Sequence, residues 1–316
     1  MINILSLFDG ISCGQLALKK LDIPINKYYA SEVDKHAIRE TIANFPNTIQ
    51  LGDIRNLDTS KLEKIDLLFG GSPCQSFSMA GKRVGMSTTE NIEVTTLQQY
   101  LDLKENGFGF SGQSYLFWEY VRVLKEVKPK YFLLENVVMA KKWEDIITNT
   151  LGVKPIKINS ALFSAQNRVR LYWTNIPDIE QPKDKEIKLS DILEDVELNK
   201  ACILGRRLNK NGVRKDNDKN IPMTQCLEVR ATNTDKSNCI TTVAKDNVLT
   251  PLPIGRHLNA FKDKLPFRYY TIKEYCRLQT IPEDYFKVSS ESQIRKMIGN
   301  GWTVDVIAHI FKNMRY

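Results

Sequence analysis

The stretch Ile65-Asp66-Leu67-Leu68-Phe69-Gly70-Gly71-Ser72-Pro73-Cys74-Gln75-Ser76-Phe77-Ser78 decides how this chain folds. Its first five residues form a short apolar run, which predicts a buried strand. The two glycines free the backbone at the end of that strand, and Pro73 restricts φ immediately before Cys74. Open α/β sheets place their ligand sites at the carboxyl ends of their strands. The stretch therefore predicts such a sheet, with a cysteine held on a stiff loop where a nucleophile is useful.

The interpretation of Cys74 as a reactive thiol depends on the rest of the chain. A cysteine is most often a small buried hydrophobic residue, and the Pro73-Cys74 pair alone favours that alternative. Four further apolar runs also end in polar residues that suit one chemistry. These runs occupy residues 2–8, 27–31, 48–52 and 131–134.

Length and composition limit the classes of protein to which this chain can belong. Its 316 residues suffice for one large domain, or for a large domain and a small one. The six cysteines form no CxxC pair, so we expect no metal site and a reducing compartment, the cytoplasm. No apolar run reaches the ~18 residues of a membrane span. The formal charge of +8 suggests a polyanionic partner, although many lysine-rich surfaces bind none.

A glycine turn joins the first predicted strand to the first predicted helix. Residues 2–8 are apolar, the turn reads Asp9-Gly10-Ile11-Ser12-Cys13-Gly14, and helical spacing begins at Gln15. Such a turn brings a mononucleotide-type ligand to a helix N-terminus. The turn alone is a weak motif, and the absence of the GxGxxG pattern disfavours a dehydrogenase.

Two acidic residues follow the next two predicted strands. Glu32 lies about 20 positions past the glycine turn, where a carboxylate can accept hydrogen bonds from both ribose hydroxyls. Asp53 can accept a hydrogen bond from an exocyclic amine, and Ile54 beside it suits an adenine ring. Each acid alone is more often a helix cap or a surface charge. In series, they predict one adenosine-shaped cleft.

The segment that follows Cys74 is polar and rich in glycine. Helical spacing covers residues 92–104, and glycines follow at 107, 109 and 112. We expect residues 84–114 to form a mobile lid, with a decorative insertion as the alternative. Residues 115–127 then predict an amphipathic helix that stops at Lys128-Pro129.

Polar residues also follow the fourth buried strand, residues 131–134. Glu135 is either a carboxylate that caps the next helix or a buried acid that carries a proton near neutrality. If residues 160–173 form a strand, its period of two places Arg168 and Arg170 on one face, together with Gln166. Paired arginines usually decorate a solvated edge, but beside a cysteine and a glutamate they can hold a phosphate or a carbonyl oxygen.

The character of the sequence changes after Pro177. Residues 178–198 are acidic and polar, residues 200–219 are basic, and residues 224–248 contain short β-type runs. These features predict a small β-rich domain whose loops contact phosphates and base edges, with a loop-rich insertion of no function as the alternative. Beyond it, Thr271 and Glu274 have the spacing of a capping box, and a final amphipathic helix ends near Phe311.

In this order, the motifs resemble those of the cytosine-C5 DNA methyltransferases, and the resemblance runs nearly from end to end. The motifs that carry it are Phe8-Asp9-Gly10, Glu32, Asp53, Gly71-Ser72-Pro73-Cys74-Gln75-Ser76-Phe77-Ser78, Glu135-Asn136-Val137, Gln166-x-Arg168-x-Arg170, Glu274-x-x-Arg277-Leu278-Gln279 and Gly299-Asn300-Gly301. Ser12-Cys13 and Gly301-Trp302 depart from the common pattern, and the latter resembles the animal de novo branch.

The resemblance implies an α/β fold with a doubly wound, mostly parallel sheet and a small β-rich target-recognition domain. It places the catalytic domain at residues 1–177, the recognition domain at 178–268 and a segment that completes the catalytic domain at 269–316. The implied reaction transfers a methyl group from S-adenosylmethionine to C5 of a cytosine flipped out of double-stranded DNA. The methyl group moves after Cys74 adds to C6 of that base, and Arg168 would hold the O2 side of the ring while Arg170 positions Glu135 or a phosphate.

The same resemblance assigns residues to three groups. The catalytic group is Cys74, Glu135, Arg168 and Arg170. The cofactor group is Phe8, Gly10, Ile11, Glu32, Asp53, Ile54, Pro73, Leu116, Asn300 and Trp302. The nucleic-acid group is Gln75, Ser78, Lys82, Arg83, Arg206, Arg207 and Arg230.

The sequence leaves two alternative functions open. One is a transfer-RNA cytosine-C5 methyltransferase built on the same motifs, which the nature of its nucleic acid would distinguish. The other is a catalytically idle DNA-binding protein, which the intact Cys74 and Glu135 disfavour. We expect a monomer without a membrane partner, associated with the nucleoid if the chain is bacterial or phage-encoded, and a cognate restriction endonuclease is a candidate partner.

Overall fold

The computed structural model describes residues 1–74, 85–195, 198–230 and 235–315. Its contacts divide the chain into two compact units. The first unit comprises Met1–Asn159, Val169–Pro182 and Val304–Tyr316, and the second comprises Ser160–Arg168 and Lys183–Thr303. Each unit contains its own sheet, so each is described by itself.

A seven-stranded sheet forms the centre of the first unit, in the order β3-β2-β1-β4-β7-β9-β8. The first five strands in this order are parallel, and β9 pairs antiparallel with both β7 and β8. The strands are β1 (Ile2–Leu7), β2 (Ile25–Ser31), β3 (Ile49–Gln50), β4 (Leu67–Gly71), β7 (Tyr131–Val137), β8 (Ile156–Asn159) and β9 (Val169–Thr174). The expected doubly wound, mostly parallel sheet is therefore confirmed.

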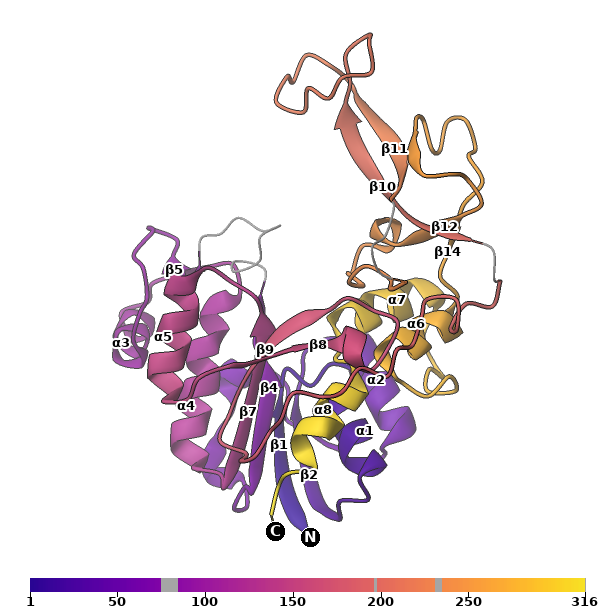
Figure 1. Cartoon of the computed structure of the whole chain (residues 1–316). Coiled ribbons are helices and arrows are strands. Elements are labelled where there is room, and N and C mark those ends of the chain that lie inside the picture. The colour runs from indigo at the N-terminus through magenta and orange to yellow at the C-terminus, as the bar shows by residue number, and fades with distance from the viewer. Residues whose placement is uncertain (75–84, 196–197, 231–234, 316) are drawn as a thin grey trace. The chain divides into compact units, whose positions relative to one another are not determined.

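Helices cover both faces of this sheet. Figure 1 shows α4 and α5 against one face and α1 and α8 against the other. The helices of the unit are α1 (Cys13–Lys20), α2 (Lys35–Asn44), α3 (Leu97–Glu105), α4 (Phe117–Val127), α5 (Lys141–Leu151) and α8 (Val304–Phe311). Because both faces are covered, the central strands are apolar throughout, which is the reason their runs are readable in the sequence.

The glycines at the end of β4 serve close packing. Gly70 lies opposite Leu7 of β1, and a Cβ at Gly70 would lie 2.6 Å from the Leu7 carbonyl oxygen. A side chain there would push β4 away from β1, so glycine is required by the approach of two backbones. The sequence predicted a flexible exit at this point, and the structure gives a different reason for the same residue.

The two ends of the chain meet in the first unit. Helix α8 packs on α1, Lys20 forms an ion pair with Asp305, and the rings of Phe69 and Phe311 lie 5.4 Å apart. The predicted final helix ending near Phe311 is confirmed. The C-terminal helix thus completes the core that β1 begins.

The expected mobile lid is wrong for the part of residues 84–114 that the structure describes. Strands β5 (Ser87–Thr88) and β6 (Phe110–Ser111) pair with each other, and α3 follows β5. Met86, Val94 and Tyr100 are buried, and the Tyr100 ring lies 5.0 Å from that of Phe110. The glycine-rich composition concealed these widely spaced apolar side chains, which attach the segment to the core.

The second unit is built on a five-stranded antiparallel sheet, in the order β13-β11-β10-β12-β14. Its elements are β10 (Asn199–Arg207), β11 (Met223–Val229), β12 (Val248–Thr250), β13 (Gly255–His257), β14 (Arg268–Tyr269), α6 (Ile272–Gln279) and α7 (Glu291–Asn300). The predicted β-rich region is confirmed, as is the capping box between Thr271 and Glu274. Residues Ala201, Ile203, Leu227, Val229, Val248 and Ala260 form a small apolar core.

The compact units do not follow the predicted boundaries at 177/178 and 268/269. Residues 160–168 and 269–303 belong with the second unit. Lys236 donates hydrogen bonds to the carbonyl oxygens of Ala161 (2.8 Å) and Ile187 (2.7 Å), and Glu274 accepts one from the Glu194 N–H (2.9 Å). These contacts between distant segments have no signature in the sequence.

Candidate active site

The turn after β1 is held in an unusual backbone conformation. Phe8, Gly10 and Ser12 have φ values of 57°, 57° and 53°. The left-handed region is unfavourable for a phenylalanine and a serine, so the surrounding contacts must hold them there. The Gly10 N–H donates to Glu32 Oε2 at 2.7 Å, while Glu32 Oε1 accepts the N–H groups of Val33 and Asp34. The structure therefore brings together Glu32 and the turn that the sequence predicted for one cleft.

Asp9 of this turn is a titratable residue that the sequence analysis did not select. Its carboxylate accepts a hydrogen bond from the Tyr28 hydroxyl at 2.7 Å and another from Ser12. Burial raises the pKa of Asp9 to about 6, although the hydrogen bonds from Ser12 and Tyr28 oppose that rise. Tyr28 was the available sequence signal for a buried Asp9, because it lies in β2, the strand next to the one that leads into this turn.

Asp53 and Ile54 lie beside the end of β2. The Ser31 hydroxyl donates to the Gly52 carbonyl oxygen at 2.7 Å, which ties the residue before Asp53 to the residue before Glu32. Asp53 caps the short 3₁₀ turn Ile54–Asn56, and its pairing with Arg55 lowers its pKa. Its side chain is 21% exposed, and Ile54 is buried. The predicted strand before Asp53 has only two residues, so the acid is both a cap and a candidate ligand.

The remaining cofactor candidates belong to three different elements. Ile11 is buried in the glycine turn, and Leu116 ends the 3₁₀ turn Ser114–Leu116 and packs against the core. Asn300 ends α7 and Trp302 follows it, and both belong to the second unit. The return of Asn300 and Trp302 to the cofactor site stays a prediction.

Cys74 lies three residues beyond β4. Pro73 and Cys74 are half-buried, and all six cysteines of the chain are thiols. Asn136 Nδ2 donates to both the carbonyl oxygen and the hydroxyl of Ser72, each at 3.1 Å, so the loop is fixed to β7 two residues before the thiol. Gln75, Ser78, Lys82 and Arg83 lie outside the described residues.

Glu135 and Arg170 form an ion pair on the strands next to Cys74. Arg170 Nε lies 3.0 Å from Glu135 Oε1, and the two side chains are only 14% and 10% exposed. Glu135 lies within β7 and opposite Gly71 of β4 in the parallel register. The prediction that the strand ends before Glu135 is therefore wrong, because β7 continues to Val137.

The prediction that Arg168 and Arg170 share one face of a strand is wrong. Strand β9 begins at Val169, so Arg168 precedes it and belongs to the second unit. Arg168 is 4% exposed, and its guanidinium donates to the carbonyl oxygens of Ile240 (3.0 Å), Gly301 (2.9 Å) and Gly299 (3.2 Å). Arg168 thus fixes the peptide groups on both sides of Asn300.

Two glutamines extend this buried network. Gln166 Nε2 donates to the Leu278 carbonyl oxygen at 3.0 Å and to Gln279 Oε1 at 3.1 Å. Gln279 Nε2 in turn donates to the carbonyl oxygens of Ile298 and Gly301, both at 3.0 Å. Three motifs that are far apart in the sequence therefore meet at the end of α7, an arrangement that only the tertiary structure reveals.

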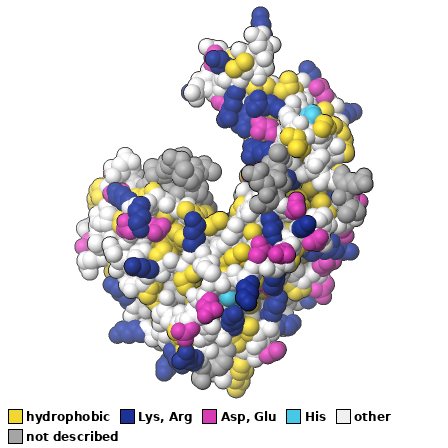
Figure 2. Space-filling view, in the orientation of Figure 1, with side chains coloured by type: hydrophobic (Ala, Val, Ile, Leu, Met, Phe, Trp, Pro, Cys, Tyr) yellow, Lys and Arg dark blue, Asp and Glu magenta, His cyan; other side chains and the backbone are white. Residues whose placement is uncertain are grey.

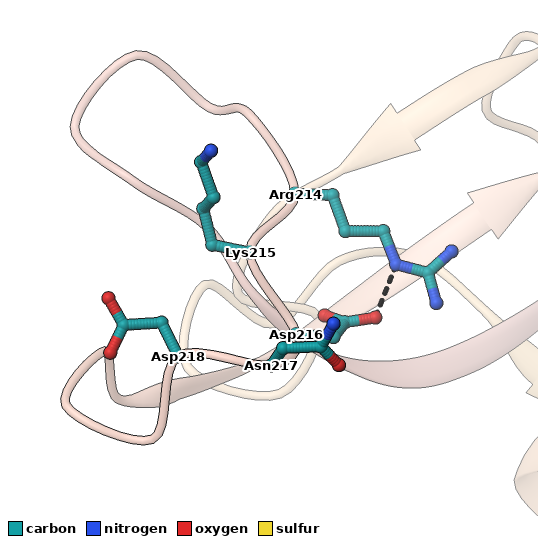
Figure 3. A pocket seen from close by; sticks show the side chains of 5 residues that line it. All are labelled: Arg214, Lys215, Asp216, Asn217 and Asp218. Carbon is teal, nitrogen blue, oxygen red and sulfur yellow. Dashed lines mark hydrogen bonds and ion pairs between the residues drawn. The ribbon is translucent and has the colours of Figure 1, made fainter.

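The candidate DNA-contacting arginines of the second unit fall into two groups. Arg206 and Arg230 both contact Glu228, whereas Arg207 donates to the Asp216 carbonyl oxygen at 3.3 Å. Residues 214–218 line a hollow of about 480 Å³ in the loop between β10 and β11, and Figure 3 shows Arg214 paired with Asp216 there. This hollow lies in a polar loop, whereas Cys74 and Glu135 belong to the first unit.

The described residues contain neither a metal-binding cluster nor a membrane-spanning helix. Within residues 1–74, 85–195, 198–230 and 235–315, no three histidine, cysteine or acidic side chains gather in a way that could hold a metal ion. In the same ranges, no helix has both the length and the apolar character needed to cross a membrane.

The chain is similar to known proteins over nearly its whole length. The family described as C-5 cytosine-specific DNA methylase matches residues 2–315. The type II methyltransferase M1.ScrFI of Lactococcus lactis subsp. cremoris is 29% identical over 99% of this chain and 77% of that protein. The orphan methyltransferase M.SPRI of Bacillus phage SPR is 32% identical, over 55% of this chain and 38% of the phage protein.

Solved structures share the fold. The structure of S. pombe Dnmt2 methyltransferase superposes with a TM-score of 0.63 at 17% identity, covering 98% of this chain and 97% of that one. A mutant of Spodoptera frugiperda DNMT2 gives a TM-score of 0.60 at 19% identity, with 99% of each chain covered. Since the fold, the order of the motifs and the family match over residues 2–315 agree, the chain belongs to the C-5 cytosine-specific DNA methylases, enzymes that methylate cytosine in DNA.

Proposed function

We propose that this chain transfers a methyl group from S-adenosylmethionine to C5 of a cytosine flipped out of a specific duplex sequence, with Cys74 bonded to C6 during the reaction. The observation that carries the proposal is the position of the Glu135–Arg170 ion pair beside the loop of Cys74. Gly71 and Glu135 are partners in the parallel register of β4 and β7, so the thiol and the acid leave the sheet at the same edge.

The residues of the first unit fit S-adenosylmethionine by the chemistry of their donors and acceptors. Glu32 offers a carboxylate for the ribose hydroxyls, and Asp53 offers one for the exocyclic amine of adenine. Phe8 and Ile54 supply apolar surface for the adenine ring, and the Ser31–Gly52 hydrogen bond holds the two acids near each other. When bound, this cofactor supplies an electrophilic methyl group on a sulfonium.

The thiol is needed because C5 of cytosine is a weak nucleophile. Addition of the Cys74 thiolate to C6 breaks the aromaticity of the ring and gives C5 enamine character. C5 then takes the methyl group, a base removes the C5 proton, and the C6–S bond breaks to regenerate the thiolate. Every bond that Cys74 forms is thus broken again within one turnover.

Glu135 and Arg170 control charge beside the base in this proposal. A protonated Glu135 can hydrogen-bond N3 of cytosine as the thiolate adds. Arg170 contacts Glu135, so it can hold the acid in position and offer its remaining N–H donors to the base. Arg168 was expected at the O2 side of the base, but its hydrogen bonds to Gly299, Gly301 and Ile240 support a positioning role instead.

A duplex that contains 5-fluorocytosine tests the proposal. Bisulfite sequencing of DNA from cells that express the chain first identifies the modified position. The purified chain is then incubated with S-adenosylmethionine and a duplex fluorinated at that position. Because fluorine cannot leave as a cation, elimination stalls, and we expect a covalent adduct that peptide mapping places on Cys74.

Two results would contradict the proposal in different ways. Methylation of the unmodified duplex without an adduct at Cys74 would reject the covalent step but retain the activity. Methylation of transfer RNA, with none of duplex DNA, would assign the chain to RNA. Substitution Cys276→Ala, which removes a buried thiol of α6, is the control for nonspecific thiol chemistry.

A further inference from the structure

The sheet of the second unit has two unlike faces. Ala201 and Ile203 of β10, with Leu227 of β11, point into the small apolar core. The alternate positions point the other way, and the antiparallel register places Glu228 opposite both Cys202 of β10 and Arg256 of β13. Side chains alternate between faces along a strand, so Glu228 and Arg256 lie on the face opposite the core.

Three arginines contact the carboxylate of Glu228 on this face. Arg206 Nε lies 2.8 Å from Glu228 Oε1, Arg256 Nε lies 3.3 Å from the same oxygen, and Arg230 Nη2 lies 3.1 Å from Oε2. Figure 2 shows the basic side chains gathered around an acidic one over the region of β10. We call Arg206, Arg230, Arg256 and Glu228 the arginine face. These four side chains together carry a net charge of +2, and Arg206 Nη1 also lies 3.8 Å from Oδ2 of Asp216.

Glu228 orders this face. Its side chain is 11% exposed, and hydrogen bonding by Arg206 lowers its pKa to about 2 against the opposing effect of burial. The hydrogen bonds from the arginines thus favour the ionised form of this carboxylate. Arg206 binds it through two nitrogens, since Nη2 also lies 3.3 Å from Oε2. The carboxylate at the centre thus contacts all three guanidinium groups and restricts their orientation.

The outer arginines remain accessible. The side chains of Arg230 and Arg256 are 53% and 37% exposed, and each contacts Glu228 through a single nitrogen. A guanidinium has five N–H donors, so each side chain has donors beyond the one that contacts Glu228. Exposed ion pairs contribute little to stability. The ordered and partly exposed arginines of this face therefore suit a binding surface better than a stabilising one.

We propose that the arginine face binds base edges of the target duplex, and that Glu228 positions Arg230 and Arg256 to do so. The inference rests on the proposed function, because it takes duplex DNA as the substrate. An arginine with a fixed plane donates two hydrogen bonds to O6 and N7 of guanine, the acceptor pair that the major groove offers. Arg207 is not part of this face, since it follows Arg206 in β10 and consecutive residues of a strand point to opposite faces.

The test compares equal charge losses on opposite faces of one sheet. Arg230→Ala and Arg256→Ala remove exposed cations of the arginine face, and Lys262→Ala removes an exposed cation from residues 258–267, which cover the apolar face. Binding is measured for the duplex found by bisulfite sequencing and for the same duplex with its guanines replaced singly. We expect each arginine variant to lose about 10- to 100-fold in affinity for the target, and to lose discrimination at one guanine.

Glu228→Gln tests the positioning role without changing the size of the side chain. The variant keeps all three arginines, so its affinity for unrelated DNA should be unchanged or higher. Its preference for the target over unrelated DNA should fall at least 5-fold. A purely structural role would instead lower the melting temperature and weaken both affinities together.

Three results would overturn the inference. If the arginine variants bind the target duplex as tightly as Lys262→Ala does, this face does not contact DNA. A uniform loss over all sequences, with a salt slope reduced by about one, would assign the arginines to phosphates. A Glu228→Gln chain that keeps full discrimination would remove its positioning role. In each case wild-type methylation of the duplex would leave the proposed function intact, which separates the two failures.

Discussion

Glu135 and Arg170 meet across two antiparallel strands although they are not direct partners. Arg170 lies opposite Val137, and Glu135 lies opposite Tyr172. Because alternate residues of a strand share a face, Arg170 reaches back by two positions and places Nε 3.0 Å from the Glu135 carboxylate. The antiparallel strand β9 therefore supplies the counter-charge for an acid carried by the parallel part of the sheet.

This ion pair gives the first prediction. Arg170→Met leaves Glu135 as a largely buried charge without its counter-ion, which costs about 3 kcal/mol of unfolding free energy. Glu135→Gln lowers the rate of methyl transfer by ~10²- to 10⁴-fold, because an amide cannot transfer a proton to N3 of the cytosine. The double variant is more stable than the sum of the single changes predicts. Urea unfolding and initial rates of methyl incorporation measure both effects, and strict additivity in stability would contradict the coupling.

Cys74 gives the second prediction. Cys74→Ala should abolish methyl transfer to DNA while the affinity for S-adenosylmethionine, measured by calorimetry, changes less than 3-fold, a difference of about 0.6 kcal/mol. The thiol lies beyond β4, whereas the cofactor candidates Glu32 and Asp53 follow β2 and β3. Loss of cofactor binding would show that the loop of Cys74 supports the cofactor site, and residual activity above 1% would remove Cys74 from the mechanism.

The sequence predicts the sheet well, because strands covered on both faces are continuous apolar runs. It predicts less about which side chains meet. Arg168 and Arg170 are two positions apart and look equivalent, yet the strand begins between them, and the start of a strand depends on its partners. The hydrogen bonds of Arg168 to Gly299 and Gly301 join residues more than 130 positions apart, and no local pattern encodes such contacts.

The segment after Cys74 illustrates a second limit. Its glycines and polar residues suggested a lid, but Tyr100 donates a hydrogen bond of 2.6 Å to the buried carboxylate of Glu119 in α4. Lys104 binds the same carboxylate at 2.5 Å. Two hydrogen bonds from this segment to one buried acid attach it to α4, although its average composition is polar. Composition averages over a segment, whereas attachment to a core depends on a few positions.

Glu119 gives the third prediction. Burial alone would raise the pKa of Glu119, but hydrogen bonds from Lys104, Tyr100 and Arg122 outweigh burial and lower it. Glu119→Gln should therefore reduce the free energy of unfolding by about 3 kcal/mol at pH 7, and amide exchange should accelerate in α3 before it does in the sheet. The exposed Lys125→Met on α4 is the control. Unchanged exchange in α3 would show that the apolar contacts alone hold this helix.

Asp9 gives the fourth prediction, which concerns pH. Its folded pKa of about 6 lies above the ordinary value of 3.8, so the folded chain binds this proton more tightly than the unfolded chain does. Protonated Asp9 therefore contributes to the free energy of unfolding. This contribution is fully present below pH 3.8 and is lost as the pH rises through 6. Asp9→Asn removes this dependence, so the difference in unfolding free energy between variant and wild type changes by about 2 kcal/mol across that window.

The control for Asp9 is an acid in solvent. Asp263→Asn is the matched control, since it replaces the exposed carboxylate of a residue in the second unit by the same amide. Chemical denaturation at pH 4, 5, 6 and 7 gives the comparison. A curve for Asp9→Asn that is parallel to the wild-type curve would mean that Asp9 ionises normally in the folded chain.

The fifth prediction concerns residues 178–268, the proposed target-recognition domain. Replacing residues 178–268 with the matching segment of a relative that methylates another sequence should change the site found by bisulfite sequencing. The Cys74 adduct with a fluorinated duplex should form as before, now on the new sequence. The donor segment needs a lysine at the place of Lys236, which holds the carbonyl oxygens of Ala161 and Ile187 and so attaches the segment to its own unit.

A second chimaera locates the boundary. Exchange of residues 183–303 moves nearly the whole second unit, including α6, α7 and the carbonyl groups that Arg168 binds. If residues 178–268 contain the readout, both chimaeras acquire the same new sequence, and the larger one is slower because Asn300 and its neighbours are foreign to Arg168. A change of sequence in the larger chimaera alone would place part of the readout in residues 269–303, and the segment would then have to be redrawn along the compact unit.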